Sequence, residues 1–209
     1  MKLTSSSFPD GGFIPDRCAL AKPDPAGGAT FSDNVNPQFS WADVPVAAHS
    51  LALICHDPCC PSRPDDVNVS DREVPLDLER VDFFHWVLVD LPVSASEIDE
   101  GEFSDGVVPH GKGPGRAAHG SRQGLNDYTG WFQGDPEMEG KFFGYDGPAP
   151  PWNDAMVHEY VFTLYALDLY RVPVDGEFTG PDVLDSIEGH VIDTATWRGK
   201  YSQNTRLRD

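Results

Sequence analysis

Three polar side chains suited to hydrogen-bonding or acid–base chemistry adjoin apolar stretches of this 209-residue chain. Asp57 follows the run Ser-Leu-Ala-Leu-Ile-Cys, His85 lies inside Phe-Phe-His-Trp-Val-Leu-Val, and His158 opens a third such run. A lone histidine in such a place is more often a core residue with its own partner. An imidazole pair beside a carboxylate, however, can donate hydrogen bonds to a phosphate or carboxylate ligand. The three together therefore favour a shared cleft.

Common catalytic signatures are missing from the sequence. The Gly-rich residues 111–115 lack the spacing of a G-x-x-x-x-G-K-[ST] loop, and residues 120–124 place their serine too early for a G-x-S-x-G elbow. The histidines form no H-E-x-x-H motif and no paired Cys-x-x-Cys set occurs. We therefore expect no metal and no cofactor. A hydrolase that uses the histidines and Asp57 stays an alternative, although no nucleophile is evident.

The elements that must position these side chains are predicted to be β-strands. Residues 50–55, 83–91 and 158–167 are rich in apolar, aromatic and β-branched residues. The first stretch stops at a His-Asp-Pro turn signal, which places Asp57 at a strand end. Alternation turns Tyr160 to the side of His158 and Glu159 away from it. It also puts His85 on the side of Phe83 and Val87.

The remaining chain indicates long loops and few helices. Thr179-Gly-Pro-Asp is typical of a helix start, and helices are expected only in this tail. Residues 59–80 and 101–157 are dense in Gly, Pro, Asp and Asn, which predicts long loops that are either functional or disordered. We expect a single, mostly β domain over residues 1–209, with a large sheet and C-terminal helices.

Charge is the most unusual bulk property, with 34 acidic against 15 basic residues and a net charge of −19. A field of this sign repels nucleic acid and anionic lipid, so neither partner is expected. A surface rich in Asp also suits a salty cytoplasm, where repulsion is screened, and a halophilic source is our hypothesis. The alternative is an acidic surface that serves solubility alone. No apolar stretch indicates a membrane span or a signal peptide, which favours a cytoplasmic protein.

The four cysteines are expected to be reduced thiols, because nothing indicates secretion. Cys59 and Cys60 are adjacent and could form a redox pair or a soft-metal site. The simpler interpretation is that they fill a turn, since reactivity requires a lowered thiol pKa.

Several motifs occur in an order that resembles the phosphatidylethanolamine-binding protein family, and in particular its prokaryotic Raf-kinase-inhibitor-like branch. The motifs are Asn36-x-x-x-x-Trp41-x-x-x-Pro45, Asp57-Pro58-Cys59-Cys60-Pro61, Phe84-His85-Trp86, Gly147-Pro148-x-Pro150-Pro151, His158-Glu159-Tyr160 and Trp197-x-Gly199-x-Tyr201. The resemblance implies a large central β-sheet, a second smaller sheet, flanking helices and a cavity for phosphate-type anions. It also implies a binder or an inhibitor of kinases or proteases rather than an enzyme.

Ligand-binding roles follow from this resemblance only. It implies that the ligand-binding residues are Asp57, His85, His158 and Tyr160, with Cys59 at the rim and Gly147, Pro148 and Pro151 as a wall. Cys59 stands where the family usually has a second Asp, and Glu159 where it usually has Arg.

Two further hypotheses concern partners. The protein could inhibit or scaffold another protein through its loops at residues 93–157, and a homodimer is also open. The segment 129–143 is longer than the family leads us to expect, and it contains Trp131, Phe132, Phe142 and Phe143. These aromatic residues could cover the cavity or bind a partner, but packing onto their own domain is the simpler interpretation.

Overall fold

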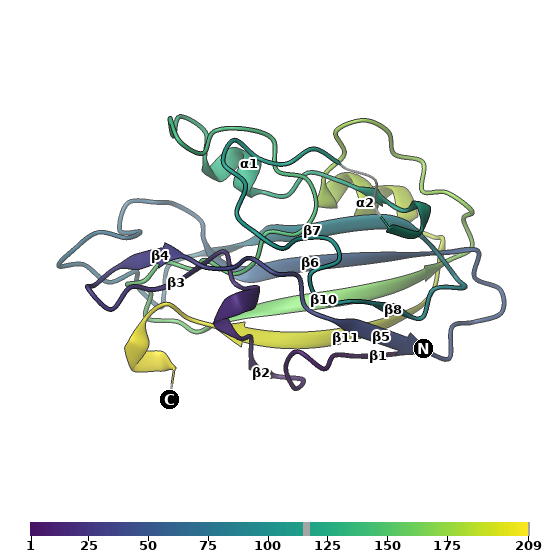
Figure 1. Cartoon of the computed structure of the whole chain (residues 1–209), viewed down its shortest axis with the longest axis horizontal. Coiled ribbons are helices and arrows are strands. Elements are labelled where there is room, and N and C mark those ends of the chain that lie inside the picture. Colours follow the sequence, from purple (N-terminus) through teal and green to yellow (C-terminus); the bar gives the residue numbers. More distant parts are fainter. Residues whose placement is uncertain (115–117, 209) are drawn as a thin grey trace.

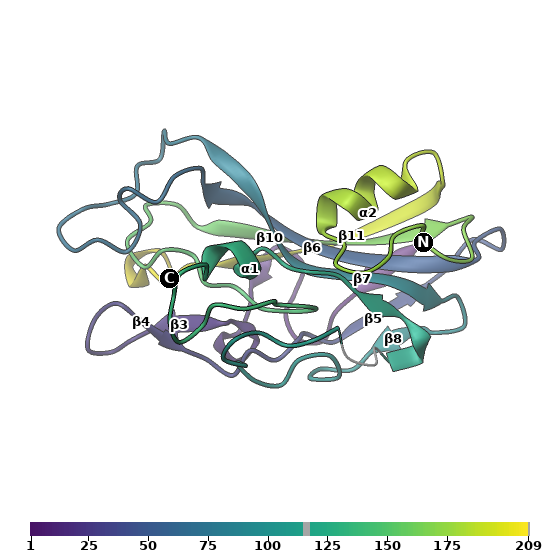
Figure 2. The same ribbon diagram turned by 90° about the horizontal axis from the view of Figure 1, so that it is seen from above.

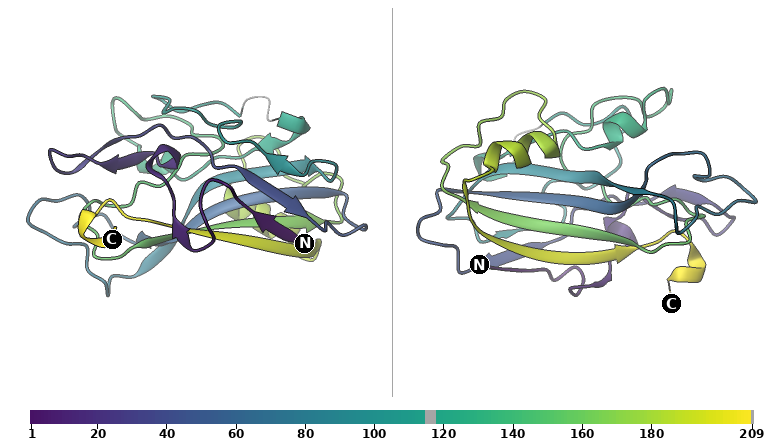
Figure 3. Two further views of the ribbon diagram at one scale, coloured as in Figure 1. Left: turned by 60° about the horizontal axis from the view of Figure 1, so that its bottom comes forward. Right: turned by 180° about the vertical axis from the view of Figure 1, so that it is seen from behind.

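Four long antiparallel strands form the centre of the computed structural model, which describes residues 1–114 and 118–208. The strands are β6 (Ser50–Pro61), β7 (Arg80–Pro92), β10 (His158–Leu167) and β11 (Val191–Tyr201), seen side by side in Figure 3. The first three contain the three predicted strands. The short strands β2 (Gly12–Phe13) and β9 (Arg122–Gln123) complete a sheet with the order β2-β11-β10-β6-β7-β9.

A second, smaller sheet covers one face of the large sheet. It has the order β1-β5-β8 and contains β1 (Lys2–Thr4), β5 (Phe39–Ala42) and β8 (Glu97–Ile98). The ring centroids of Phe39 in β5 and Phe162 in β10 lie 4.8 Å apart in the main core between the two sheets. This contact buries apolar surface from both sheets. The predicted mostly β fold with a large and a smaller sheet is confirmed.

Helix α2 (Gly180–Ile187) covers the opposite face of the large sheet (Figure 2). It begins with a capping box, in which the Thr179 side chain and the Asp182 carboxylate each accept from the other residue's backbone N–H. The helix predicted here is confirmed. The expectation that helices occur only in the tail is wrong, because α1 (Tyr128–Trp131) forms one helical turn inside an expected loop (Figure 1).

Shorter elements complete the described chain. They are the hairpin of β3 (Ala21–Pro23) and β4 (Ala29–Phe31) and the 3-10 turns η1 (Asp16–Cys18), η2 (Ala118–Gly120) and η3 (Thr205–Leu207). The long loops largely occur where they were predicted, between β6 and β7 and between β8 and β10. Residues 115–117 include the last residue of the Gly-rich segment and belong to the expected partner loops, and they lie outside the described residues.

Irregular pairing carries β6 beyond its predicted end. Asp57 does not end its strand, as the sequence suggested, because β6 continues to Pro61 through further register shifts. Between Asp57 and Cys60 the strand advances three residues while its partner β7 advances two. A bulge of this kind inserts one unpaired residue and changes which side chains face a given side.

A second bulge places His85. Cys55 pairs with Trp86 but the next residue of β6, His56, pairs with Phe84, so His85 is the extra residue of β7. The side chain of Val87 packs under α2 on the opposite face of the sheet from the His85 ring, which lies beside Tyr160. The expectation that His85 shares a side with Val87 is therefore wrong, because a bulge turns consecutive side chains to the same face.

Candidate functional site

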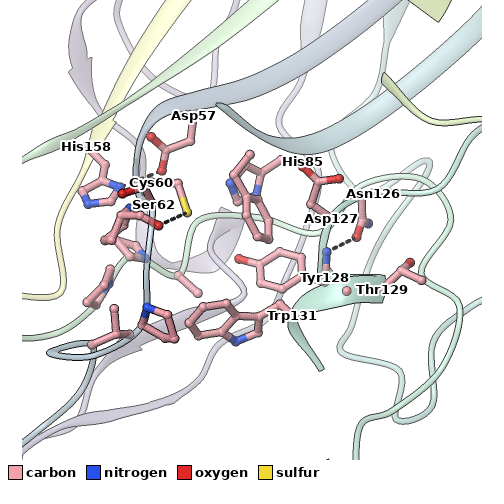
Figure 4. A pocket seen from close by; sticks show the side chains of 18 of the residues that line it. Asp57, Cys60, Ser62, His85, Asn126, Asp127, Tyr128, Thr129, Trp131 and His158 are labelled. Carbon is pink, nitrogen blue, oxygen red and sulfur yellow. Dashed lines mark hydrogen bonds and ion pairs between the residues drawn. The ribbon is translucent and has the colours of Figure 1, made fainter. Parts of the chain in front are cut away.

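A cavity of about 750 Å³ lies at the end of the large sheet where β6 ends and β7 and β10 begin. Strand residues form its floor, and the loops at residues 61–68, 125–131 and 149–151 form its walls. Figure 4 shows Asp57 and His158 at one side of the floor and His85 with Tyr128 and Trp131 at the other. The sequence predicted that Asp57, His85 and His158 would meet, and the structure brings them together.

His158 is enclosed by carboxylates. Its Nδ1 atom lies 2.6 Å from Asp57 Oδ2, and its Nε2 atom lies 3.0 Å from Asp154 Oδ2. A carboxylate can only accept these hydrogen bonds, so both ring nitrogens carry protons. Burial alone would lower the pKa of His158, but the two carboxylates outweigh burial and raise it to about 9.

Arg80 extends this cluster and was not predicted from the sequence. Its guanidinium donates to both carboxylate oxygens of Asp154, at 2.6 and 3.1 Å, and to the Cys59 carbonyl oxygen at 2.9 Å. Burial favours the neutral acid form of Asp154, yet the hydrogen bonds from His158 and Arg80 lower its pKa overall. The formal charges of Asp57, Asp154, His158 and Arg80 therefore cancel.

His85 has the opposite environment. Its Nδ1 atom lies 2.8 Å from the carbonyl oxygen of Asp146, which can only accept a hydrogen bond. The ring packs against aromatic rings of Phe83, Tyr128 and Tyr160. Burial lowers the pKa of His85 to about 4, and the nearby Asp57 charge offsets only part of this shift. At neutral pH the ring is uncharged, with the proton on Nδ1 and a lone pair on Nε2 that accepts no hydrogen bond from residues 1–114 and 118–208.

These contacts correct one expectation about chemistry. Both histidines were expected to donate hydrogen bonds to ligand oxygens. Both N–H groups of His158 are already bonded to carboxylates, and Nε2 of His85 can only accept in the neutral ring. A ligand that contacts His85 Nε2 must itself carry a proton.

Tyr160 lies on the same face as His158, as predicted from strand alternation. Its hydroxyl is buried and has no hydrogen-bond partner within residues 1–114 and 118–208. Burial, reinforced by the Asp57 charge, raises the pKa of this hydroxyl well above its ordinary value. The group is therefore neutral and can donate or accept. Glu159 points away from the cavity and pairs with Arg198 on the surface.

Of the predicted wall residues, Pro151 lines the cavity, whereas Gly147 and Pro148 do not. The Gly147 carbonyl oxygen accepts from the Tyr128 hydroxyl at 2.8 Å. A Cβ atom at Gly147 would approach the Cys18 carbonyl oxygen to 2.0 Å, so only glycine can pack here.

Cys60 lines the cavity in place of Cys59, because of the bulge after Asp57. The Cys59 N–H instead donates to Asp57 Oδ1 at 2.7 Å. Burial raises the pKa of the Cys60 thiol to about 12 and also raises that of Cys59, which argues against thiolate reactivity. Among the described residues all four cysteines are free thiols.

The aromatic residues of segment 129–143 differ in how far they are buried. Phe142 and Phe143 are buried, and Phe132 packs beside Phe142 with ring centroids 5.3 Å apart. Trp131 is 47% exposed and lines the cavity mouth. The segment thus packs largely on its own domain and contributes Thr129, Gly130 and Trp131 to the cavity wall.

Residues 1–114 and 118–208 contain no group of three or more His, Cys, Asp or Glu placed to hold a metal ion. Within the same residues no helix has the length and apolar character that crossing a membrane requires.

Comparison with known proteins identifies the family. The sequence profile described as Phosphatidylethanolamine-binding protein matches residues 4–202. A UPF0098 protein of Methanothermobacter thermautotrophicus is 32% identical over 96% of this chain and 98% of its own length. The UPF0098 protein YbhB of Escherichia coli is 29% identical over 97% of this chain and 100% of its own.

Two solved structures agree with this family assignment. The phosphatidylethanolamine-binding protein homologue CT736 of Chlamydia trachomatis has a TM-score of 0.64 at 27% identity and covers 97% of both chains. Escherichia coli YbcL has a TM-score of 0.68 at 22% identity, covering 96% of this chain and 97% of its own, which shows the shared fold. The profile match and the full-length relatives lead to one conclusion. This chain belongs to the phosphatidylethanolamine-binding protein family.

Proposed function

We propose that the protein is a non-enzymatic binding protein whose cavity takes a small ligand with a phosphate-type head that carries at least one proton. The observation that supports this most strongly is the free Nε2 lone pair of His85 at the cavity floor, fixed by the Nδ1 contact with Asp146. A proton-bearing head can donate to this atom. The residues that we assign to ligand binding are Asp57, His85, His158, Tyr160, Pro151 and, in place of Cys59, Cys60.

The charge of the cavity floor favours a singly charged head. Asp57, Asp154, His158 and Arg80 sum to zero, so the buried cluster offers no net positive charge to balance a dianion. A phosphomonoester has a second pKa near 6, so its singly protonated form is abundant in mildly acidic solution. The lipid in the family's description carries an ammonium group beside its phosphate, and that group is also rich in N–H donors.

The walls favour an apolar body next to the head. Phe83, Tyr128, Trp131 and Pro151 present rings to the cavity, and such apolar walls with few polar groups are typical of small-molecule sites. A soluble ligand suits this chain better than a membrane surface, because the net charge of −19 repels anionic lipid.

The geometry supports binding over hydrolysis. Neither nitrogen of His158 is free to act as a base, and His85, with a pKa of about 4, is a weak one. The Cys60 thiol, with a pKa of about 12, is not a ready nucleophile. Inhibition of a protein through the loops gains less support, because most aromatic residues of segment 129–143 are packed inward.

The test compares two ligands of nearly equal shape. Phenyl phosphate carries a proton in its monoanionic form, whereas phenyl sulfate carries none. Calorimetric titration near pH 5.5 should give roughly 10-fold or more tighter binding of the phosphate, the worth of one hydrogen bond to a charged group. The preference should be retained in His190→Ala, which changes an exposed histidine, and lost in His85→Ala. Equal affinity for the two ligands, or binding of neither, would overturn the proposal.

A further inference from the structure

The backbone of Asp146 makes two hydrogen bonds with His85. The Asp146 N–H donates to the His85 carbonyl oxygen at 3.0 Å, and the Asp146 carbonyl oxygen accepts from His85 Nδ1 at 2.8 Å. Asp146 does not line the cavity, and only 2% of its surface is exposed. The location of the imidazole proton therefore depends on where the backbone of this buried residue is held.

The side chain of Asp146 is anchored by three donors. Asn34 Nδ2 and Asn126 Nδ2 each donate to its carboxylate at 2.7 Å, on different oxygen atoms. Lys112 Nζ donates to Oδ1 at 3.2 Å. Burial raises the pKa of Asp146, while the Lys112 charge and the two amides oppose the rise. The ammonium group is thus the only full positive charge among the three anchors.

Lys112 also binds the backbone beside Asp146. Its ammonium group donates to the Tyr145 carbonyl oxygen and, at 2.9 Å, to Ser104 Oγ. Lys112 is remote in sequence from His85 and does not line the cavity. With three acceptors, its three N–H donors are fully used, which is a strong constraint on a flexible side chain.

We propose that Lys112 and Asp146 are positioning residues that keep the His85 proton on Nδ1 and so make the cavity select proton-bearing head groups. The selectivity part of this inference rests on the proposed function. The two neutral forms of an imidazole differ only in which nitrogen holds the proton, so the Nδ1–H bond to Asp146 can decide between them. If the backbone of Asp146 shifts, the imidazole proton moves from Nδ1 to Nε2. Nε2 of His85 then donates a hydrogen bond to the ligand instead of accepting one.

The first measurement needs no ligand. Nitrogen-15 NMR of the histidine side chains should show His85 protonated on Nδ1 in the natural protein. Lys112→Met should give a mixture of both forms or the Nε2–H form, and Lys112→Arg should restore the original signal. Lys141→Met is the matched control, because Lys141 pairs with Glu177 on the surface. An unchanged His85 signal in Lys112→Met would overturn the inference.

The second measurement addresses selectivity. The preference for phenyl phosphate over phenyl sulfate should fall about threefold or more in Lys112→Met, in step with the NMR change. If Lys112→Met does not fold, Asp146→Asn keeps the size and removes the charge, and the same shift is expected. A shifted proton with an unchanged ligand preference would overturn the selectivity claim. Failure of the natural protein to bind either ligand would instead overturn the proposed function, and the NMR result would still decide the role of Lys112.

Discussion

Two histidines at opposite sides of one cavity floor differ in charge although both are buried. His158 is 1% exposed and lies between two carboxylates, which raise its pKa to about 9. His85 is 3% exposed and lies among aromatic rings beside a carbonyl oxygen, and its pKa falls to about 4. Burial disfavours the charged form at both positions. The partners, rather than burial itself, decide which histidine is charged.

The two sides of the cavity also differ in the hydrogen-bonding groups that they leave available to a ligand. The His158 side is an ion-paired cluster whose hydrogen bonds are directed inward, so it adds stability and rigidity but offers few free donors. The His85 side leaves one acceptor free. Under the proposed function, the neutral His85 supplies the selective contact, while the charged His158 lines the cavity with both of its N–H groups already bonded.

The largest expected effect is on the free energy of unfolding, and it comes from breaking the ion pair between Arg80 and Asp154. Arg80→Met leaves Asp154 without its guanidinium partner, and both side chains are largely buried. Loss of one partner of a buried pair should lower the free energy of unfolding by about 3–5 kcal/mol, measured by urea denaturation. Arg198→Met, which breaks a surface pair with Glu159, should cost at most about 1 kcal/mol. Equal costs for the two variants would contradict the comparison.

The next largest effect is a loss of stability at acidic pH, and it is caused by protonation of His85. Its pKa is 6.5 when unfolded and about 4 when folded, so the unfolded chain binds the proton first. Stability should therefore fall as the pH drops from about 6.5 to 4, by about 3 kcal/mol from this group. In His85→Phe the loss over this range should be smaller by that amount, and in His190→Phe it should match the natural protein. No difference between the two variants would count against a neutral His85.

His158 has the opposite effect on the pH dependence of stability, and its effect appears at alkaline pH. Its folded pKa of about 9 exceeds the unfolded value of 6.5, so its contribution is complete below about pH 6.5. The contribution should be lost as the pH rises through 9, by at most about 3 kcal/mol. NMR titration of the His158 ring should show a midpoint near 9, well above the ordinary histidine value of 6.5. A midpoint below 6.5 would reverse our assignment of charge.

The smallest effect concerns the wall beside His85. Tyr128→Phe removes the hydrogen bond that the Tyr128 hydroxyl donates to the Gly147 carbonyl oxygen. The cost should be about 1 kcal/mol in urea unfolding. Because the His85 ring keeps its Asp146 partner, the nitrogen-15 signals of His85 should not change. A change in those signals would show that Tyr128 helps to hold the imidazole proton.

The long strands could be predicted because their composition is unambiguous. Aromatic and β-branched runs define β6, β7 and β10, and the capping sequence at Thr179 defines the start of α2. β11 was not predicted, since most of its side chains are exposed or half-buried and give no apolar signal. The one-turn helix α1 was missed because its Gly-Trp-containing sequence has no helical periodicity.

The site residues likewise divide into those that the sequence predicted and those that it did not. Asp57, His85 and His158 were found because each adjoins a recognisable strand. Arg80 and Asp154 were missed, since a single Arg or Asp in a polar loop region has no local signature. Their contact joins positions 74 residues apart, and only the folded chain creates it.

The sequence by itself determined the residue types of the site, the strands that hold them and the acidic character of the surface. Only the tertiary structure decided which histidine is charged, which nitrogen of His85 is free and that Cys60 rather than Cys59 faces the cavity. The physical reason is that strand composition is local, whereas bulges, burial and hydrogen-bond partners depend on segments brought together from across the chain.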